Sequence, residues 1–172
     1  MRRLSELYGG NGGSYVSLII ILAEVNLTLS LVRNISNFFS SSLLIYGEFW
    51  QVIGPLLLVF MNVATTLLTV QTMFELPSSK RGAWRSTVRK LIALIVMSVL
   101  MDLFDMNYSP LNTLFITVLT IGVIIMMFLP SMRRYHTPYL TEVPPLSYWL
   151  KALVIIPDKK DFQYRFVPAE KR

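Results

Sequence analysis

The sequence predicts an all-α integral membrane protein whose four transmembrane helices form two antiparallel hairpins. Of its 172 residues, 53% are hydrophobic and only 15% are charged, which is little polar surface for a soluble domain. The hydrophobic residues fall in long blocks that match the thickness of a bilayer. Lysines and arginines gather between and after these blocks, a pattern typical of membrane proteins with one strongly basic side.

The chain divides into a flexible, glycine-rich N-terminal segment (1–14), a membrane domain (15–129) and a basic, aromatic C-terminal tail (130–172). The first span is predicted at 15–32, which as a helix is about 27 Å long and crosses a hydrocarbon core of about 30 Å. The second span is predicted at 49–74, with Trp50 as an interfacial anchor. Between them, 35–47 is too polar for a span, and its aromatic residues favour a position in the membrane interface.

The second half of the membrane domain contains two shorter apolar blocks, which predict spans at 91–106 and 113–129. A short polar turn containing Pro110 separates them, and Pro130 ends the second block. Because the turn is so short, these two spans must run antiparallel.

The positive charges predict the orientation of the chain. The central loop, 75–90, carries Lys80, Arg81, Arg85, Arg89 and Lys90. With a cytoplasmic N-terminus, every lysine and arginine except Arg33 lies on the cytoplasmic side. We therefore expect both termini in the cytoplasm and the spans in a plasma or inner membrane. The net charge of +6 then reflects orientation and contact with anionic lipids, and we expect no nucleic-acid partner.

One segment of the tail has a clear periodicity. Apolar residues recur on one helical face at Leu146, Trp149, Leu150, Leu153 and Val154. This spacing predicts an amphipathic helix that lies on the membrane or on a partner. A small β-hairpin is the alternative, with strands at 152–156 and 162–167, because aromatic residues alternate along the second strand. Both interpretations make the tail a docking segment.

Glu24 is the first candidate for an intramembrane polar site, because it lies about 15 Å into the first span. An ionised carboxylate at that depth costs at least about 2.5 kcal/mol, so it should face the bundle interior, form an ion pair or be protonated. Two interpretations stay open: a relay for protons or cations, or a hydrogen-bonded contact between helices. Asn26 and Asn62 are at comparable depth and are the expected partners.

A second group of acids is predicted near the non-cytoplasmic side. Asp102 and Asp105 share one helical face, and Glu48 precedes the second span at the same level. They form either an acidic cluster that attracts cations or ordinary solvated groups at the interface. Arg33 is the expected salt-bridge partner.

No set of residues indicates catalysis, a metal site or a cofactor. The chain has no cysteine and a single histidine, His136, without acids at metal-binding spacing. The expected docking residues for a partner or for lipid are the cations of the central loop and tail together with one aromatic residue: Arg81, Arg85, Arg89, Arg133, Arg134 and Trp149.

These observations favour a non-catalytic accessory subunit of a larger membrane complex of the secretion, respiratory or translocation type. The expected bundle has few polar residues in its interior, and the tail has too little core to fold alone. The expected partners are other membrane protein subunits. The alternative is a small homo-oligomeric transporter or channel that uses Glu24 for protons or cations.

Overall fold

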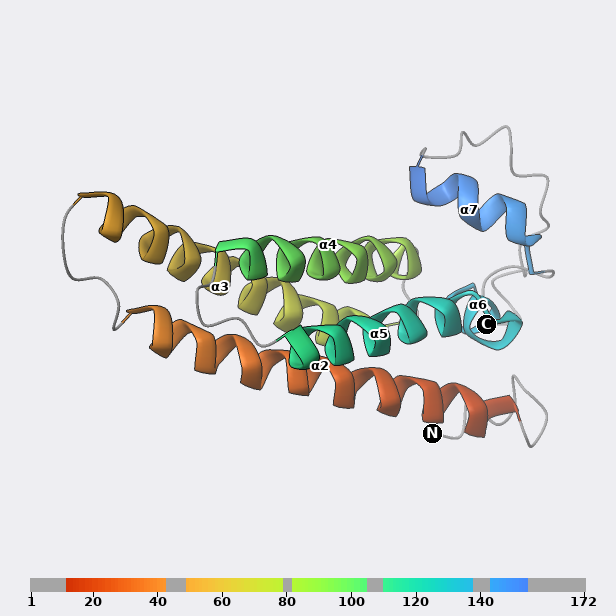
Figure 1. The fold of residues 1–172 in the computed structure, drawn as a ribbon. Helices are drawn as coiled ribbons and strands as arrows, with labels where there is room; N and C mark the ends of the chain where they lie inside the picture. Colours follow the sequence, from red (N-terminus) through yellow and green to blue (C-terminus); the bar gives the residue numbers. More distant parts are fainter. Residues whose placement is uncertain (1–11, 43–48, 79–81, 105–109, 138–142, 155–172) are drawn as a thin grey trace.

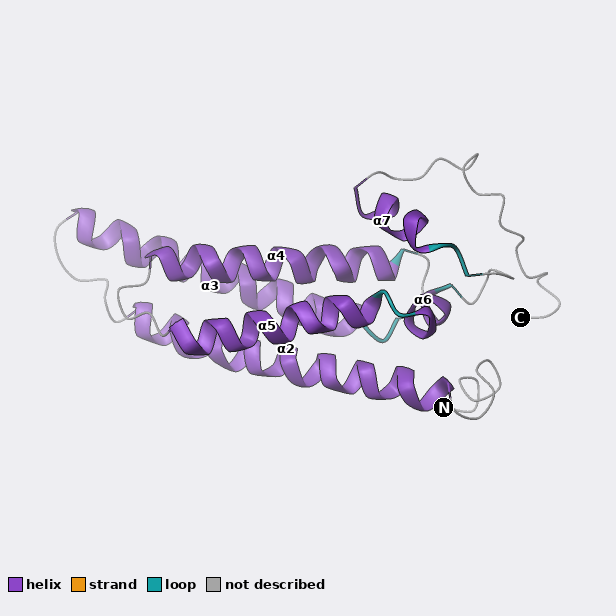
Figure 2. Ribbon diagram, turned by 45° about the vertical axis from the view of Figure 1, so that its right-hand side comes forward, coloured by secondary structure: helices purple, strands orange, loops and turns teal. Residues whose placement is uncertain are grey.

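The structure, a computed structural model, describes residues 12–42, 49–78, 82–104, 110–137 and 143–154, and all regular elements in these ranges are helices (Figure 2). The helices are α2 (Gly12–Ser42), α3 (Phe49–Glu75), α4 (Ala83–Phe104), α5 (Pro110–Met127), α6 (Pro130–His136) and α7 (Leu146–Val154). The prediction of an all-α fold is confirmed for these residues.

Four long helices pack side by side with alternating direction (Figure 1). Helix α2 packs against α3 and α5, and α4 packs against the same two helices, so the four form a closed ring. The short helix α6 follows α5 at an angle of 71°. Figure 1 shows the start of α2, the connection between α3 and α4, and helices α6 and α7 at one end of the bundle, here called the basic end.

Two of the described helices are long and apolar enough to cross a membrane: Tyr15–Phe39 and Val52–Glu75. They indicate a membrane protein. A third would qualify only if α5 and the bent α6 formed one span. Helix α4 does not qualify because cations occupy its first turns and Asp102 its last, which leaves only Leu91–Met101 without charged side chains.

Helix α2 is longer at both ends than the predicted first span. It begins at Gly12 and continues to Ser42, through Arg33 and through much of the segment expected in the interface. Arg33 and Asn34 do not end the helix, because the Arg33 side chain binds neighbouring helices and Asn34 is buried. In the tail, Ala152–Val154 belong to α7, so the first strand of the alternative hairpin is wrong at these residues, and its second strand lies outside the described residues.

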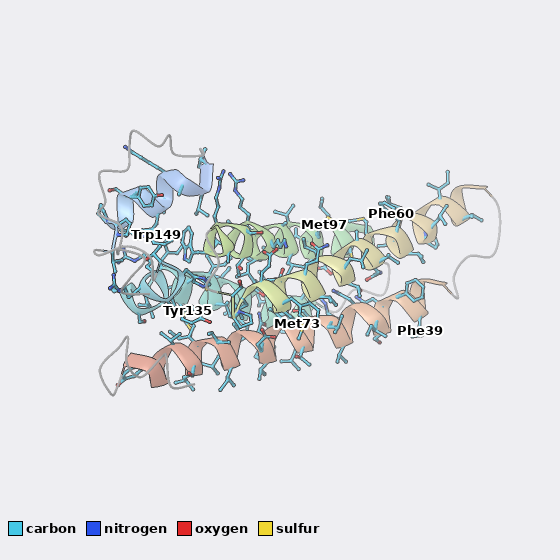
Figure 3. The ribbon with its side chains drawn as sticks, turned by 180° about the vertical axis from the view of Figure 1, so that it is seen from behind. Phe39, Phe60, Met73, Met97, Tyr135 and Trp149 are labelled. Carbon is cyan, nitrogen blue, oxygen red and sulfur yellow. The ribbon has the colours of Figure 1, made fainter. Side chains whose placement is uncertain are left out.

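The bundle differs from a soluble protein in having an apolar surface around an interior that mixes apolar and polar side chains. Most large side chains exposed on the four long helices are apolar, among them Phe60 of α3, which is 71% exposed (Figure 3). The buried side chains include many polar ones: Asn26, Ser30, Asn34, Asn62, Thr65, Thr69, Thr72, Thr87, Ser98, Thr113 and Thr120. An apolar exterior with the polar side chains kept inside, among buried apolar ones, is the arrangement that hydrocarbon surroundings favour.

Candidate functional site

A stripe of polar residues runs along the buried face of α3. Asn62, Thr65, Thr69 and Thr72 follow each other at helical spacing, and each is at most 1% exposed. Their donors bind carbonyls one turn earlier in the same helix; the Thr69 hydroxyl, for example, donates to the Thr65 carbonyl at 2.8 Å. The expectation of a bundle with few polar interior residues is therefore wrong. The polar side chains of α3 can be buried because their donors bind carbonyls of the same helix and need no water.

Asn26 joins α2 to α5. Its side-chain amide donates to the Thr120 hydroxyl at 3.0 Å, and both residues are buried. The hydroxyl in turn donates to the Ile116 carbonyl at 2.8 Å. The carboxamide oxygens of Asn26 and Asn62 have no hydrogen-bond partner among the described residues. Asn26 therefore acts as a contact between helices, which is one of the roles predicted at this depth.

Glu24 does not join the two asparagines. It is half-buried on the flank of α2, between the buried Ala23 and the exposed Val25. Its backbone carbonyl accepts the Thr28 hydroxyl at 2.8 Å, but no described residue pairs with its carboxyl group. The predicted cluster of Glu24, Asn26 and Asn62 is thus divided between the outer flank of α2 and the interior.

Arg33 lies at the centre of the most connected polar group, which we call the Arg33 network: Arg33, Ser98, Asp102 and Thr113. The guanidinium donates to the Ser98 hydroxyl at 2.7 Å and to the Thr113 hydroxyl at 3.3 Å. The Thr113 hydroxyl donates to the Asp102 carboxylate at 3.1 Å, and this carboxylate acts electrostatically on the guanidinium. One side chain of α2 therefore ties together α4 and α5.

Of the three predicted far-side acids, the structure describes Asp102, which belongs to the Arg33 network. Asp102 is linked to Arg33 through Thr113, while Glu48 and Asp105 lie outside the described residues. Helical spacing identified Asp102 and charge asymmetry singled out Arg33, but neither signal identified Ser98 or Thr113. For Thr113 the sequence offered a weak signal, since Thr113 and Thr120 are seven residues apart and lie on one face of α5.

The basic end has an aromatic core. Trp84, at the start of α4, is 3% exposed and donates its indole N–H to the Met127 carbonyl at 2.7 Å. Its ring meets Phe128 and Trp149 edge to face, with centroids 5.1 and 4.4 Å away. Figure 3 shows Trp149 between α7 and the end of the bundle. This core attaches the tail to the helices of the membrane domain.

Two arginines hold the tail through its backbone. The Arg89 guanidinium donates to the Leu153 carbonyl at 2.8 and 2.5 Å, at the C-terminal end of α7. Arg133 donates to the Pro144 carbonyl at 3.0 Å, and the same carbonyl accepts the Trp149 indole N–H at 3.1 Å. A cation at the C-terminus of a helix also offsets the negative end of its dipole.

The predicted docking residues are therefore largely used inside the chain. Trp149 is only 4% exposed, and Arg89 and Arg133 bind the tail of the same molecule. Arg85 and Arg134 are half-buried near the same end, and Arg81 lies outside the described residues. Sequence periodicity had placed Trp149 correctly on the apolar face of a helix, but could not tell that Trp149 is buried against the bundle while Leu146, Leu150 and Val154 of that face stay exposed.

Helix α6 packs against the connection that follows α3. The Tyr135 hydroxyl donates to the Pro77 carbonyl, and the neighbouring His136 is 2% exposed. Burial lowers the pKa of His136 from 6.5 to about 4, against a smaller opposing effect of the Ser78 backbone. The imidazole is therefore neutral at physiological pH.

Fold and site together define a helical membrane protein that buries polar residues within its bundle and binds its tail at one end. No family model matches the chain, and no curated protein or solved structure matches it either.

Proposed function

We propose that the chain is a non-catalytic accessory subunit of a larger membrane complex, with α2, α3, α4 and α5 all crossing the bilayer. The surfaces of α4 and α5 support four spans. Among the residues of α4 and α5 between 91 and 127 whose burial the structure describes, the exposed side chains are apolar, whereas the hydroxyl residues Ser98, Thr113 and Thr120 are buried and Thr117 is half-buried. Hydrocarbon surroundings explain this distribution better than water does.

The distribution of cations supports the proposed orientation. The central loop, α6 and α7 lie at the same end of the bundle as the start of α2 (Figure 1). Among the cations of the long helices, Arg33 lies far from this end, in contact with the last turns of α4 and the first turn of α5. With the basic end in the cytoplasm, both termini follow the positive-inside rule.

The observation that carries the proposal is the outward face of α7. Trp149 and Ala152 are buried against the bundle, and Arg89 fixes the last turn. The same helix keeps Leu146, Leu150 and Val154 on its outside, 47%, 51% and 80% exposed. A short helix that is held in place while it presents an apolar face is preorganised to bind a partner subunit.

The test is the size of the complex in its native membrane. We expect Leu150→Glu to shift the solubilised protein from a large assembly to the free chain in native gel electrophoresis. Ser147→Glu adds the same charge at another exposed position of α7 and leaves the assembly intact. A wild-type chain that runs as a lone monomer after mild solubilisation contradicts the proposal.

The alternative is a homo-oligomeric proton- or cation-coupled transporter. The position of Glu24 favours a pathway between copies of the chain over a pathway inside one bundle. The half-buried Glu24 on the flank of α2 would lie at the interface between copies of the chain. The comparison of wild type with Glu24→Gln in reconstituted vesicles tests this function. Absence of proton or cation flux through the wild type rejects it.

A further inference from the structure

Fully exposed polar side chains on the membrane-facing surface are found on α2, whereas the half-buried ones, Glu24 among them, also include Thr66 of α3, Asp102 of α4 and Thr117 of α5. Every side chain whose exposure the structure describes as high is apolar in 52–70 of α3, 91–102 of α4 and 113–127 of α5. Helix α2 differs from these helices because its polar residues Ser17, Thr28 and Ser36 are exposed and its Glu24 is half-buried. Hydrocarbon alone gives no reason for such a difference between four neighbouring helices.

Three polar residues of α2 lie with two isoleucines on a helix-packing repeat, and the exposed Ser36 lies outside it. Ser17, Ile21, Glu24, Thr28 and Ile35 are spaced by four, three, four and seven residues, and we call this line the α2 seam. At 100° per residue, these positions stay within a narrow stripe along the helix. A repeat of seven residues is the pattern that packs against a second helix at a small crossing angle, in membranes as in water.

Glu24 gives the seam its chemistry. It lies roughly 14 Å along the helix from Tyr15, inside the span Tyr15–Phe39. Its carboxyl group has no partner among the described residues, although the chain provides Arg33 with two hydroxyls and a nearby carboxylate. An acid at this depth is stabilised by a hydrogen-bond donor, and a cation is the donor that gains most in hydrocarbon.

We propose that the α2 seam binds a transmembrane helix of a partner subunit that carries a lysine or arginine at the level of Glu24. This inference rests on the proposed function, since it names the chemistry of the partner. It assigns the membrane contact to α2, whereas the outward face of α7 lies at the basic end.

The test uses synthetic helices in place of the unidentified partner. The chain has no cysteine, so Arg172→Cys provides a single site for a donor dye. The labelled full chain is reconstituted in phosphatidylcholine vesicles with an acceptor-labelled poly-leucine transmembrane peptide that has one central lysine. We expect energy transfer to show about ten-fold tighter association than with the same peptide lacking the lysine.

Two variants locate the binding face. Glu24→Leu should reduce the affinity for the lysine peptide to that of the all-leucine peptide. Asn26 binds Thr120, so Ile121, which is 44% exposed on α5, lies near the level of Glu24. The double variant Glu24→Leu/Ile121→Glu moves the carboxyl group to another helix at similar depth, and we expect it to leave the affinity low. Circular dichroism checks that each variant keeps its helices.

Three results would overturn the inference: equal affinity for both peptides, restored affinity in the double variant, or energy transfer between two labelled copies of the chain that Glu24→Leu abolishes. The last would make a second copy the occupant of the seam. The proposed function is tested separately, because a native complex that survives Glu24→Leu but dissociates with Leu150→Glu rejects this inference alone.

Discussion

The two ends of the bundle hold their arginines with different partners. At the basic end, Arg89 and Arg133 donate to backbone carbonyls, of Leu153 at the end of α7 and of Pro144 just before it. At the other end, Arg33 donates to the side chains of Ser98 and Thr113. Backbone carbonyls accept from these two arginines and side-chain oxygens accept from Arg33, although at the basic end the Lys90 ammonium pairs with the Glu75 carboxylate at 2.6 Å.

Helix geometry explains this difference. The last carbonyls of a helix have no hydrogen-bond partner within it. A helix that ends near an arginine, as α7 ends near Arg89, therefore offers carbonyl acceptors that no other bond uses. Inside a long helix every carbonyl is already bonded, so an arginine there needs hydroxyl or carboxylate acceptors from neighbouring helices. The basic end can therefore position a short helix, whereas the Arg33 network locks three long ones.

The largest expected effect comes from removing the acid of the Arg33 network. Asp102→Ala leaves the guanidinium half-buried without its counter-charge, and we expect the free energy of unfolding to fall by about 4 kcal/mol. Unfolding by denaturant in detergent micelles, followed by circular dichroism, measures the change.

Thr113→Val serves as the control, because it removes the bridging hydroxyl but keeps both charges. We expect a loss of about 1 kcal/mol, typical of one interhelical hydrogen bond in a membrane. The double variant Arg33→Met/Asp102→Leu should recover most of the stability lost in Asp102→Ala. If Asp102→Ala costs no more than Thr113→Val, the carboxylate does not stabilise Arg33.

The second effect tests the basic end. Trp149→Ala removes a buried indole from the contact with Trp84, and we expect the docking of α7 to weaken by about 3 kcal/mol. Limited proteolysis should then cut the tail rapidly while the long helices stay protected. Leu150→Ala is the control, because Leu150 is 51% exposed and its truncation should leave the tail as resistant as in the wild type.

The sequence predicted the helices better than their partners. Hydrophobic blocks located α3 and α5 closely, because block length directly measures a helix that must satisfy its own backbone. The same reasoning predicted that the first span ends at Arg33, because a solvated cation marks the end of a transmembrane helix. It failed there because Ser98 and Thr113 come from helices far along the chain, and no local pattern predicts that they converge on a guanidinium.

The candidate site shows the same limit. Periodicity correctly predicted a helix around Trp149. It could not tell which surface the helix binds, because an apolar face can pack against the membrane as well as against the bundle. The indole contact with Trp84 joins α4 to α7, which are far apart in the sequence, so no local pattern predicts it. Charge counting predicted Arg89 to dock a partner or lipid for the same reason, since only the folded tail brings the Leu153 carbonyl to it.

A third, smaller effect follows from the buried His136. Because its pKa is about 4 in the folded protein and 6.5 ordinarily, the unfolded chain takes up a proton first as the pH falls. The stability that the neutral ring contributes is full above pH 6.5 and is lost between pH 6.5 and 4. Between pH 8 and pH 5 the loss amounts to about 2 kcal/mol.

Unfolding curves of wild type and His136→Phe across this pH range measure the effect. The variant should lose the part of the slope that lies between pH 6.5 and 5, where most carboxyl groups remain ionised. Parallel curves for the two proteins would show that the histidine is not protected from protonation in the folded state.

The smallest effect tests how Arg89 holds α7. Arg89→Gln removes a cation that donates to the Leu153 carbonyl, and we expect the last turn of α7 to loosen by about 1 kcal/mol. Hydrogen exchange of the α7 amides should then be about five times faster. Arg85→Gln makes the same charge change one turn earlier in α4 and should leave this exchange unchanged. Equal acceleration in both variants would assign the effect to net charge at the basic end, and the contrast between backbone and side-chain acceptors would lose its support there.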